Sequence, residues 1–370
     1  MSIKKLIPPQ LINWAEKNKD KKILLAISGG VDSSVTGWIL KELGMSVTAV
    51  FMKNWDEDKD PEPSKCSSAE DFSDVQSVCH KIGIDYHTVN LASEYWDEVF
   101  AHFLNELKAG RTPNPDILCN KEIKFKHLFR LLNELKFDVL ATGHYARIEN
   151  SKLMKGVDEN KDQSYFLYDI NKQVLPRVTF PLGCMEKSTV REIANKVGLA
   201  NANKKDSTGI CFIGERKFTN FVSNYLKGKK GKILDENGLV VGEHSGLAFY
   251  TIGQRHGLKL GGAGEPWFVY HKDITSNELF VTRGTKSKYL FKQELIAKNC
   301  NWLVDIETID FTKKYSAKIR YRQQDQACEI TKIDNQSVRV LFEDPQRAIA
   351  PGQSVVFYDQ NICLGGGVIQ

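Results

Sequence analysis

The sequence lacks any run approaching the roughly 20 uninterrupted apolar residues that a membrane-spanning helix needs. Its first residues, MSIKKLIPPQLINWAEKNKDKK, have no apolar signal core and include Glu16 and Asp20. They therefore support neither a secretory nor a transit peptide. Internal repeats and low-complexity segments are also missing. We expect a cytoplasmic protein that does not bind membranes.

The sequence also lacks a C-x-x-C pair, although it contains 8 cysteines. This spacing argues against a zinc ribbon and against a secreted disulfide scaffold. In a reducing compartment, most of these cysteines should be small buried hydrophobic residues. The sequence identifies no set of metal ligands, so the metal-binding residues stay unknown.

The composition is that of a globular protein, with 41% hydrophobic and 26% charged residues. A chain of 370 residues is long enough for two or three domains. The formal net charge of +5 permits an RNA partner but does not require one.

The first part of the chain alternates apolar runs with helix-like segments. Such alternation predicts an α/β domain with a parallel sheet and helices on both faces. Ligands of these sheets bind at the carboxyl ends of the strands. The segments that follow KKILLAI, SVTAVFM and DVLAT should therefore face one cleft.

Residues 110–120, GRTPNPDILCN, interrupt this pattern. Because two prolines flank an asparagine, we expect a shaped loop here and not a regular helix. A helix is expected again in STVREIANKVGL, and the Lys/Gly-rich LKGKKGKI indicates a domain boundary.

After this boundary the pattern is typical of β-structure. Asn237-Gly238 predicts a hairpin with a two-residue turn. Regularly spaced short strands after Lys286 predict a small barrel. We therefore expect three domains: an α/β catalytic domain over 1–220, with 1–21 as an N-terminal extension, a small central β-rich domain over 221–285, and a C-terminal β-barrel over 286–370.

The sharpest local motif is SGGVDSS, residues 28–34, between the first apolar strand and a helix. Glycines let a backbone approach an anion closely, and a helix N-terminus supplies free N–H groups, so the motif suits a polyphosphate. It has neither the Walker A nor the G-x-G-x-x-G spacing. From this motif alone, a plain strand-to-helix turn capped by Ser and Asp is an equally good interpretation. Asp32 is our candidate to approach Mg²⁺, directly or through water.

Two cysteines have sequence neighbours that are compatible with a catalytic role. Asp116 precedes Cys119 by three residues and could take a proton, although its charge would also raise the thiol pKa. Cys211 lies in DSTGICF between apolar neighbours. For either cysteine alone, a buried inert thiol is the ordinary alternative.

SGGVDSS resembles the PP-loop of the ATP pyrophosphatases, which cleave ATP between the α- and β-phosphates and transfer AMP to an oxygen. A wider set of motifs follows in this order along the chain: SGGVDSS, FMKNW, GRTPNPDILCNKEIKF, ATGHYAR, KDQSYFL, KKDSTGICFIGER, YTIGQRHGL, RYRQ and APGQ. This set closely resembles the bacterial tRNA-specific 2-thiouridylases nearly from end to end. The N-terminal extension, residues 1–21, is the main departure from that family.

This resemblance implies a PP-loop domain of the adenine nucleotide alpha hydrolase type, with ATP and Mg²⁺ as cofactors. It implies adenylation of the C2 carbonyl oxygen of the wobble uridine in tRNA. Persulfide sulfur then replaces that oxygen, giving 2-thiouridine, AMP and pyrophosphate. The implied partners are tRNA and a persulfide donor, either a sulfur-relay protein or a cysteine desulfurase.

The resemblance also assigns roles to residues. Cys211 matches the persulfide-bearing cysteine, Cys119 the second catalytic cysteine, and Asp116 the acid beside it. Direct attack by the persulfide on the adenylated carbon stays open. So does attack by Cys119 on that persulfide, which releases sulfide and leaves a transient disulfide.

Further matches concern binding. The ATP positions are Ala26, Ile27, Ser28, Gly29, Gly30, Val31, Asp32, Ser33, Met52 and Gly143. The positions that meet the target base are Asn114, Pro115 and Asp116. The other tRNA positions are His144, Lys161, Asp162, Gln163, Arg320, Tyr321 and Gln353. Basic, aromatic and amide side chains suit phosphates and splayed bases, although each alone could be an ordinary surface residue.

Three other functions compete with this interpretation. A PP-loop ligase for a small metabolite would need neither both cysteines nor the β-domains. A lysidine synthetase needs no catalytic cysteine, and a 4-thiouridine synthase normally carries different RNA-binding domains at its N-terminus. An RNA-binding module with a decayed ATP domain would not require an intact SGGVDSS, Asp116, Cys119 and Cys211.

Overall fold

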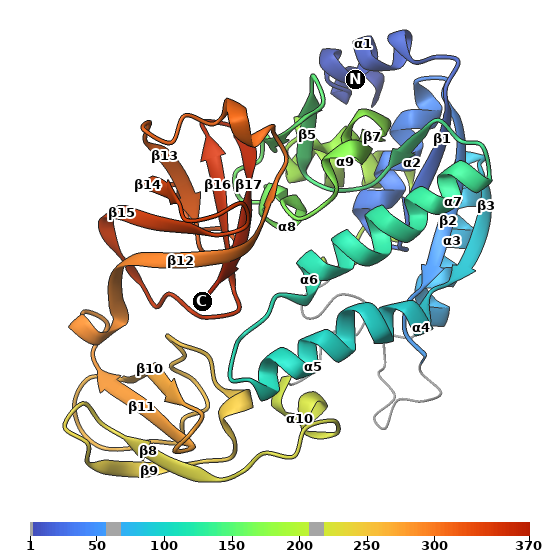
Figure 1. The fold of residues 1–370 in the computed structure, drawn as a ribbon. Coiled ribbons are helices and arrows are strands. Elements are labelled where there is room, and N and C mark those ends of the chain that lie inside the picture. The colour runs from blue at the N-terminus through green and yellow to red at the C-terminus, as the bar shows by residue number, and fades with distance from the viewer. Residues whose placement is uncertain (1–2, 57–67, 207–217) are drawn as a thin grey trace.

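The computed structural model describes residues 3–56, 68–206 and 218–370. Figure 1 shows an α/β domain beside two β-structures, a small sheet and a barrel that lie one above the other. The predicted succession of a parallel-sheet domain, a small β-rich domain and a barrel is confirmed. No helix in the described part of the chain has the length and apolar character needed to cross a membrane.

The α/β domain contains a parallel five-stranded sheet in the order β3-β2-β1-β4-β7. Its strands are β1 (Lys22–Ile27), β2 (Ser46–Lys53), β3 (Asp85–Asn90), β4 (Val139–Ala141) and β7 (Val178–Thr179). Since β2 and β4 flank β1 on opposite sides, the carboxyl end of β1 lies at the point where the strand order reverses. Crevices at such points are the usual ligand sites of α/β sheets.

Both faces of this sheet are covered, which explains why β1 is apolar without interruption. Leu24 and Ala26 belong to one hydrophobic core. Ile23, Leu25 and Ile27 alternate with them and belong to a second core on the opposite face.

Helices of the second core cover one face of the sheet: η1 (Ile3–Leu6), α1 (Pro9–Lys17), α2 (Val31–Glu42), α3 (Ser68–Ile82) and α9 (Lys187–Val197). The other face, toward the β-structures in Figure 1, carries α4 (Ala92–Tyr95), η3 (Trp96–Phe100), α5 (Ala101–Lys108), α6 (Pro115–Leu118), η4 (Cys119–His127) and α7 (Leu128–Glu134). Shorter elements are α8 (Ser164–Leu167), η5 (Lys172–Arg177), η6 (Pro181–Cys184) and α10 (Phe218–Ser223).

The expectation of a loop over residues 110–120 was wrong in its second half. A helix begins at Pro115 and continues through α6, η4 and α7. Proline is tolerated at the first helical position, because that N–H has no intrahelical acceptor in any case. The side chain of Asn114 caps the helix by accepting a hydrogen bond from the Asp116 N–H at 3.1 Å.

The N-terminal segment is part of the folded α/β domain. Ile7, Leu11 and Ala15 are buried in the second core. Its apolar side chains therefore cover helices on the face of the sheet that lies away from the β-structures.

The central sheet has the order β10-β11-β8-β9. It is formed by β8 (Gly231–Leu234), β9 (Val240–His244), β10 (Trp267–Asp273) and β11 (Glu278–Arg283), with η7 (Leu247–Phe249) between β9 and β10. The predicted β8–β9 hairpin exists, but its turn was misjudged. Asp235 N donates to Leu239 O at 2.9 Å, so three residues form the turn. Of the predicted pair, Gly238 has a positive φ of 80° and Asn237 does not.

The C-terminal strands form a closed antiparallel barrel in the order β12-β15-β14-β13-β16-β17, with β12 pairing to β17. The strands are β12 (Phe291–Trp302), β13 (Tyr315–Lys318), β14 (Gln326–Lys332), β15 (Val338–Arg347), β16 (Ser354–Asp359) and β17 (Ile362–Ile369), with η8 (Lys288–Leu290) and η9 (Ile306–Thr308) beside them. A hairpin from the first half of the chain, β5 (Ala146–Glu149) and β6 (Lys152–Lys155), joins this sheet through the pair Ile362 and Met154. The sequence pattern did not predict this hairpin.

The first hydrophobic core is shared by all three parts of the molecule. It includes Cys119 from the α/β domain, Val269 from the central sheet and Tyr358 from the barrel. The barrel interior forms a separate core. The predicted boundaries at 220/221 and 285/286 stay predictions.

Candidate functional site

The residues matched to the nucleotide site gather at the carboxyl edge of the parallel sheet. Ala26 and Ile27 end β1, Ser28, Gly29 and Gly30 form the loop, Val31, Asp32 and Ser33 begin α2, Met52 lies on β2, and Gly143 follows β4. A Cβ on Gly143 would lie 2.8 Å from Ser33 N and 3.0 Å from the Asp32 carbonyl carbon. The segments after β1 and β4 therefore meet, as the sequence predicted.

The loop from Ser28 to Ser34 is held by its own hydroxyl groups. Ser33 Oγ donates to Gly30 O at 3.1 Å and accepts from Ser28 N at 3.2 Å. Ser34 Oγ donates to the same carbonyl at 2.9 Å. From outside the loop, the buried Asn201 amide donates to Gly29 O at 2.8 Å. These bonds pre-organise the N-terminus of α2, where free N–H groups favour an anion.

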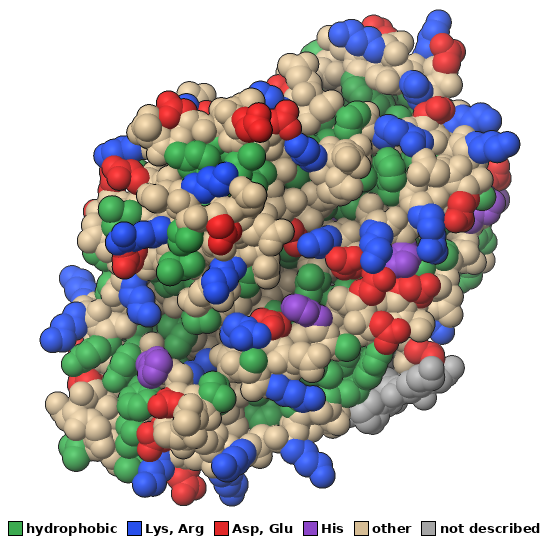
Figure 2. Space-filling model, in the orientation of Figure 1, with side chains coloured by type: hydrophobic (Ala, Val, Ile, Leu, Met, Phe, Trp, Pro, Cys, Tyr) green, Lys and Arg blue, Asp and Glu red, His purple; other side chains and the backbone are tan. Residues whose placement is uncertain are grey.

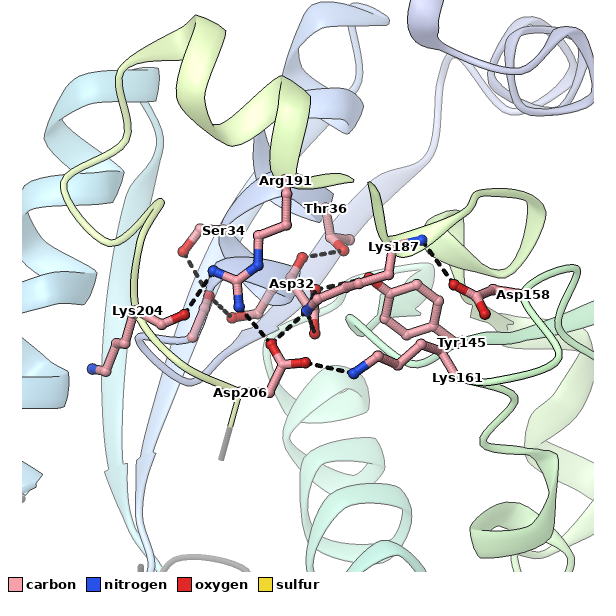
Figure 3. A network of polar contacts seen from close by, with 12 residues as sticks. Asp32, Ser34, Thr36, Tyr145, Asp158, Lys161, Lys187, Arg191, Lys204 and Asp206 are labelled. Carbon is pink, nitrogen blue, oxygen red and sulfur yellow. Dashed lines mark hydrogen bonds and ion pairs between the residues drawn. The ribbon is translucent and has the colours of Figure 1, made fainter. Parts of the chain in front are cut away.

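The carboxylate of Asp32 is bonded to two other side chains. Lys187 Nζ lies 2.6 Å and 2.8 Å from its two oxygens, and Tyr145 Oη donates to Oδ1 at 2.8 Å (Figure 3). Burial, followed by the charge of Asp32, raises the pKa of Tyr145 far above its ordinary value, so the phenol stays a donor. These contacts occupy both oxygens that we expected to approach Mg²⁺. The described residues contain no cluster of three or more potential metal ligands.

Asp206 extends this network away from the loop. Its carboxylate contacts Lys187 and Arg191 at 2.7 Å and Lys161 at 2.6 Å (Figure 3). Burial alone would raise the pKa of Asp206, but hydrogen bonds from Lys161 and Lys187 lower it well below its ordinary value. Asp206 is therefore a permanent anion at physiological pH.

Cys119 lies on the long helix that begins at Pro115. The spacing of three residues sets Asp116 and Cys119 on the same side of this helix. Cys119 is fully buried in the shared core, and the helix widens to π geometry from this residue onward. Such π segments are frequent at functional sites. Cys211 lies outside the described residues.

His144 is buried against aromatic rings. Its Nδ1 lies 2.6 Å from Thr142 Oγ1, and its ring contacts Phe125 and Phe180. Burial, with a smaller contribution from the charge of Lys124, lowers its pKa well below 6.5. The imidazole is therefore neutral at physiological pH.

The segment 161–163, matched to tRNA, makes mainly internal bonds. Asp162 is buried, and its Oδ1 accepts from Gly156 N at 3.0 Å and from Ser164 N at 3.1 Å. Gln163 Oε1 accepts from Tyr145 N at 2.9 Å. These bonds shape the segment that presents Lys161.

The predicted tRNA residues of the barrel lie beside the other domains. Arg320 donates to Ala348 O at 2.5 Å, and burial lowers its pKa below the ordinary value. Tyr321 packs against Phe166 with ring centroids 4.5 Å apart. Gln353 Nε2 donates to Thr112 O at 2.6 Å, four residues before Asp116. Figure 2 shows Lys and Arg side chains over this face of the molecule, including its middle, where the three parts meet.

The sequence interpretation missed Lys187, Tyr145 and Arg191. Lys187 is 155 positions from Asp32, and no local pattern links the two residues. Tyr145 was within a quoted motif, ATGHYAR, but nothing in the motif identified its hydroxyl partner. Tertiary folding alone brings Lys187 and Tyr145 to the loop and Arg191 to Asp206.

A nucleotide-type loop on a parallel sheet, followed by a small β-domain and a barrel, defines a HUP-domain protein with two β-appendages. Family models agree with this class. They match residues 21–215 as "tRNA methyl transferase HUP domain", 219–283 as "tRNA methyl transferase PRC-barrel domain" and 292–369 as "Aminomethyltransferase beta-barrel domain".

Curated relatives identify the family. The chain is 52% identical over 360 residues to tRNA-specific 2-thiouridylase MnmA of Francisella tularensis subsp. novicida (strain U112), covering 95% of this chain and 99% of the relative. The same figures hold for the protein of that name from subsp. holarctica (strain LVS). The chain belongs to the tRNA-specific 2-thiouridylase family. A solved NMN synthetase from Francisella tularensis is only distantly similar, with 15% identity and a TM-score of 0.36, over 56% of this chain and 76% of that one.

Proposed function

We propose that the protein catalyses ATP-dependent 2-thiolation of the wobble uridine of tRNA in the cytoplasm. One observation carries the proposal: identity to the 2-thiouridylases extends over 95% of this chain and 99% of the relative. It therefore includes both β-structures as well as the nucleotide domain. We further propose that residues 1–220 are catalytic and that the barrel, 286–370, binds tRNA.

In the first step, the C2 carbonyl oxygen of uridine attacks the α-phosphorus of ATP, and pyrophosphate leaves. The N–H groups at the start of α2 and the Ser28 and Ser33 hydroxyls suit the phosphates. Met52 and Gly143, on the neighbouring strand ends, are the further nucleotide contacts. Mg²⁺ would enter with ATP, because substrate phosphates supply part of its oxygen ligands, and would offset their charge.

In the second step, sulfur replaces the adenylated oxygen. The terminal sulfur of a Cys211 persulfide attacks C2, or Cys119 first attacks Cys211 Sγ and releases hydrosulfide, which then attacks C2. AMP leaves with the former carbonyl oxygen. Both routes end in a Cys119–Cys211 disulfide, which a cellular thiol reduces; in the first route it forms when Cys119 releases the thiolated uridine. Asp116 takes or returns a proton beside Cys119.

The proposed tRNA contacts come from all along the chain. Asn114, Pro115 and Asp116 meet the target base at the start of the Cys119 helix. His144, Lys161, Asp162, Gln163, Arg320, Tyr321 and Gln353 contact other parts of the tRNA. Support for a composite surface comes from the Gln353–Thr112 hydrogen bond, which joins the barrel to the segment before Asn114. The persulfide is supplied by a sulfur-relay protein or a cysteine desulfurase.

The direct test uses unmodified tRNA, the pure protein, Mg-ATP and a cysteine desulfurase system. Nucleosides are then analysed by mass spectrometry, with ATP omitted in a parallel reaction. The expected result is ATP-dependent 2-thiouridine at the wobble position.

A competent sulfur supply with ATP turnover to AMP, but without a thiolated nucleoside, would reject the proposal. A PP-loop ligase for a small metabolite would then explain the ATP chemistry better. In that case Cys119 and Cys211 would be structural thiols.

A further inference from the structure

A cluster of charged side chains lies beside the nucleotide loop. Lys161, Lys187 and Arg191 share Asp32 and Asp206 (Figure 3). Lys187 is central, because it contacts both carboxylates at 2.6–2.7 Å. Asp158, the third carboxylate of this cluster, accepts a hydrogen bond from the Lys187 backbone N–H at 2.9 Å. Lys187 is the cation of the cluster that contacts the first turn of α2.

The position of Lys187 is not one that its own helix favours. It is the first residue of α9, and a cation at a helix N-terminus is opposed by the helix dipole. Its side chain is only 12% exposed, so much of its hydration is lost. Such a placement requires anionic partners.

The loop itself lacks the positive charge that a polyphosphate needs, and Lys187 can supply it. Residues 28–34 contain no basic residue, whereas a polyphosphate carries several negative charges. Lys187 Nζ already lies within 2.8 Å of Asp32, a residue of that loop. A flexible four-carbon side chain can turn from a carboxylate to a phosphate without movement of the backbone.

We infer that Lys187 is the cation that binds the β- and γ-phosphates of ATP, and that Asp206 competes with these phosphates for it. The inference rests on the proposed use of ATP at the SGGVDSS loop. When Lys187 turns to the phosphates, Lys161 and Arg191 continue to neutralise Asp206. Tyr145 continues to donate to Asp32. The exchange therefore leaves neither carboxylate without a partner.

A purely structural role for Lys187 makes a different prediction. If Lys187 only fastens α9 to α2, loss of either Lys187 or Asp206 should damage the loop and weaken every nucleotide. If Lys187 binds phosphate, the two substitutions should act in opposite directions.

The experiment measures binding of α,β-methylene-ATP with Mg²⁺ by calorimetry. Lys187→Gln should weaken binding about 10- to 100-fold, the effect of losing one charge-assisted hydrogen bond. Asp206→Asn should tighten it severalfold, because a competing anion is removed. AMP, which lacks the β- and γ-phosphates, should bind Lys187→Gln and the wild type similarly.

Two further variants serve as controls. Lys196→Gln, on the same helix but paired with Glu192 at the surface, should bind like the wild type. Lys187→Arg keeps the charge and should retain most of the affinity. Thermal unfolding of each variant establishes that it is folded. If Lys187→Gln does not fold, Asp206→Asn still tests the inference. Tighter binding of the ATP analogue supports phosphate binding by Lys187, and weaker binding supports a purely structural role.

Two results would overturn the inference: equal affinity of Lys187→Gln and wild type for the ATP analogue, or weaker binding by Asp206→Asn. Failure of the proposed function is distinguishable, since the wild type itself would then not thiolate tRNA, whether or not it binds the analogue. If the wild type does both and Lys187→Gln binds normally, the inference alone is wrong.

Discussion

Around the nucleotide loop, Asp32, Lys187 and Asp206 are charged, partly exposed and bonded to one another. Cys119, by contrast, is fully buried in a hydrophobic core shared by three parts of the chain. Both regions belong to the same α/β domain, but different interactions stabilise them. Electrostatic attraction stabilises the loop region, and hydrophobic burial stabilises the region around Cys119.

The comparison separates binding from chemistry. A polyanion needs N–H donors and cations, which the loop region provides. The Cys119 thiol is fully buried, so it is shielded from solvent and oxidants. Substitutions should therefore affect ATP affinity in one region and sulfur transfer or folding stability in the other.

The largest expected effect is on sulfur transfer. Cys119→Ser should reduce 2-thiouridine formation by about three orders of magnitude or more, because a hydroxyl replaces the attacking thiolate. ATP binding should be nearly unchanged. Nucleoside mass spectrometry and calorimetry measure the two quantities. The same change at Cys79, a buried thiol whose pKa burial raises to about 11, should preserve thiolation. Full activity of Cys119→Ser would remove Cys119 from the mechanism, and the same test applies to Cys211→Ser.

The next effect is on stability, in the aromatic cluster that packs beside the Cys119 helix. Phe100 is 1% exposed and contacts the rings of Trp55 and Tyr225 at centroid distances of 5.1 Å and 5.0 Å. Phe100→Ala should lower the free energy of unfolding by about 3–5 kcal/mol, as measured by urea denaturation. Trp96→Ala removes a ring of the same cluster that is 41% exposed and should cost clearly less. Equal losses would show that burial does not determine stability here.

A smaller effect is expected at the loop itself. Gly143→Ala would bring a Cβ to 2.8 Å from Ser33 N, and backbone must shift to relieve this contact. Overpacking of this kind costs about 1–3 kcal/mol. Because its relief moves Ser33 N away from the proposed phosphate site, ATP affinity should fall about 5- to 150-fold. Gly261→Ala, where a Cβ meets nothing within 4 Å, is the matched control. Unchanged affinity of Gly143→Ala would argue against Gly143 as a nucleotide contact.

The smallest effect concerns pH. The pKa of His144 is well below 6.5 in the folded protein, so below pH 6.5 the unfolded chain binds a proton that the folded chain does not. Stability should therefore fall as pH drops below 6.5, by up to about 1.4 kcal/mol per pH unit for this group. Urea denaturation at about pH 7.5 and 5.5 should give a difference that shrinks by about 1 kcal/mol in His144→Gln. The exposed His80→Gln should behave like the wild type, and an identical pH dependence in all three would contradict the burial argument.

The sequence predicted those features that depend on neighbouring residues. Alternation of apolar runs predicted the parallel sheet and the barrel, and SGGVDSS predicted the loop at the sheet edge. Two local interpretations were wrong for local reasons. Pro115 was read as a helix breaker although it begins a helix, and Asn237-Gly238 was read as a two-residue turn although Asp235 shapes a longer one. Both errors arose because the same residue type occurs in two kinds of local structure: proline interrupts helices and also begins them, and Asn-Gly occurs in turns of different lengths.

By itself, the sequence determined the order of the three parts, the nucleotide loop and the family, because periodicity and motifs are properties of adjacent residues. Only the tertiary structure decided that Lys187 faces Asp32, that a hairpin at 146–155 extends the barrel sheet, and that Cys119 lies in a core shared with Val269 and Tyr358. These contacts join residues far apart in the chain. Their energies come from charge pairing and burial, which depend on distance in space. Such contacts therefore produce no recognisable pattern of spacing in the sequence.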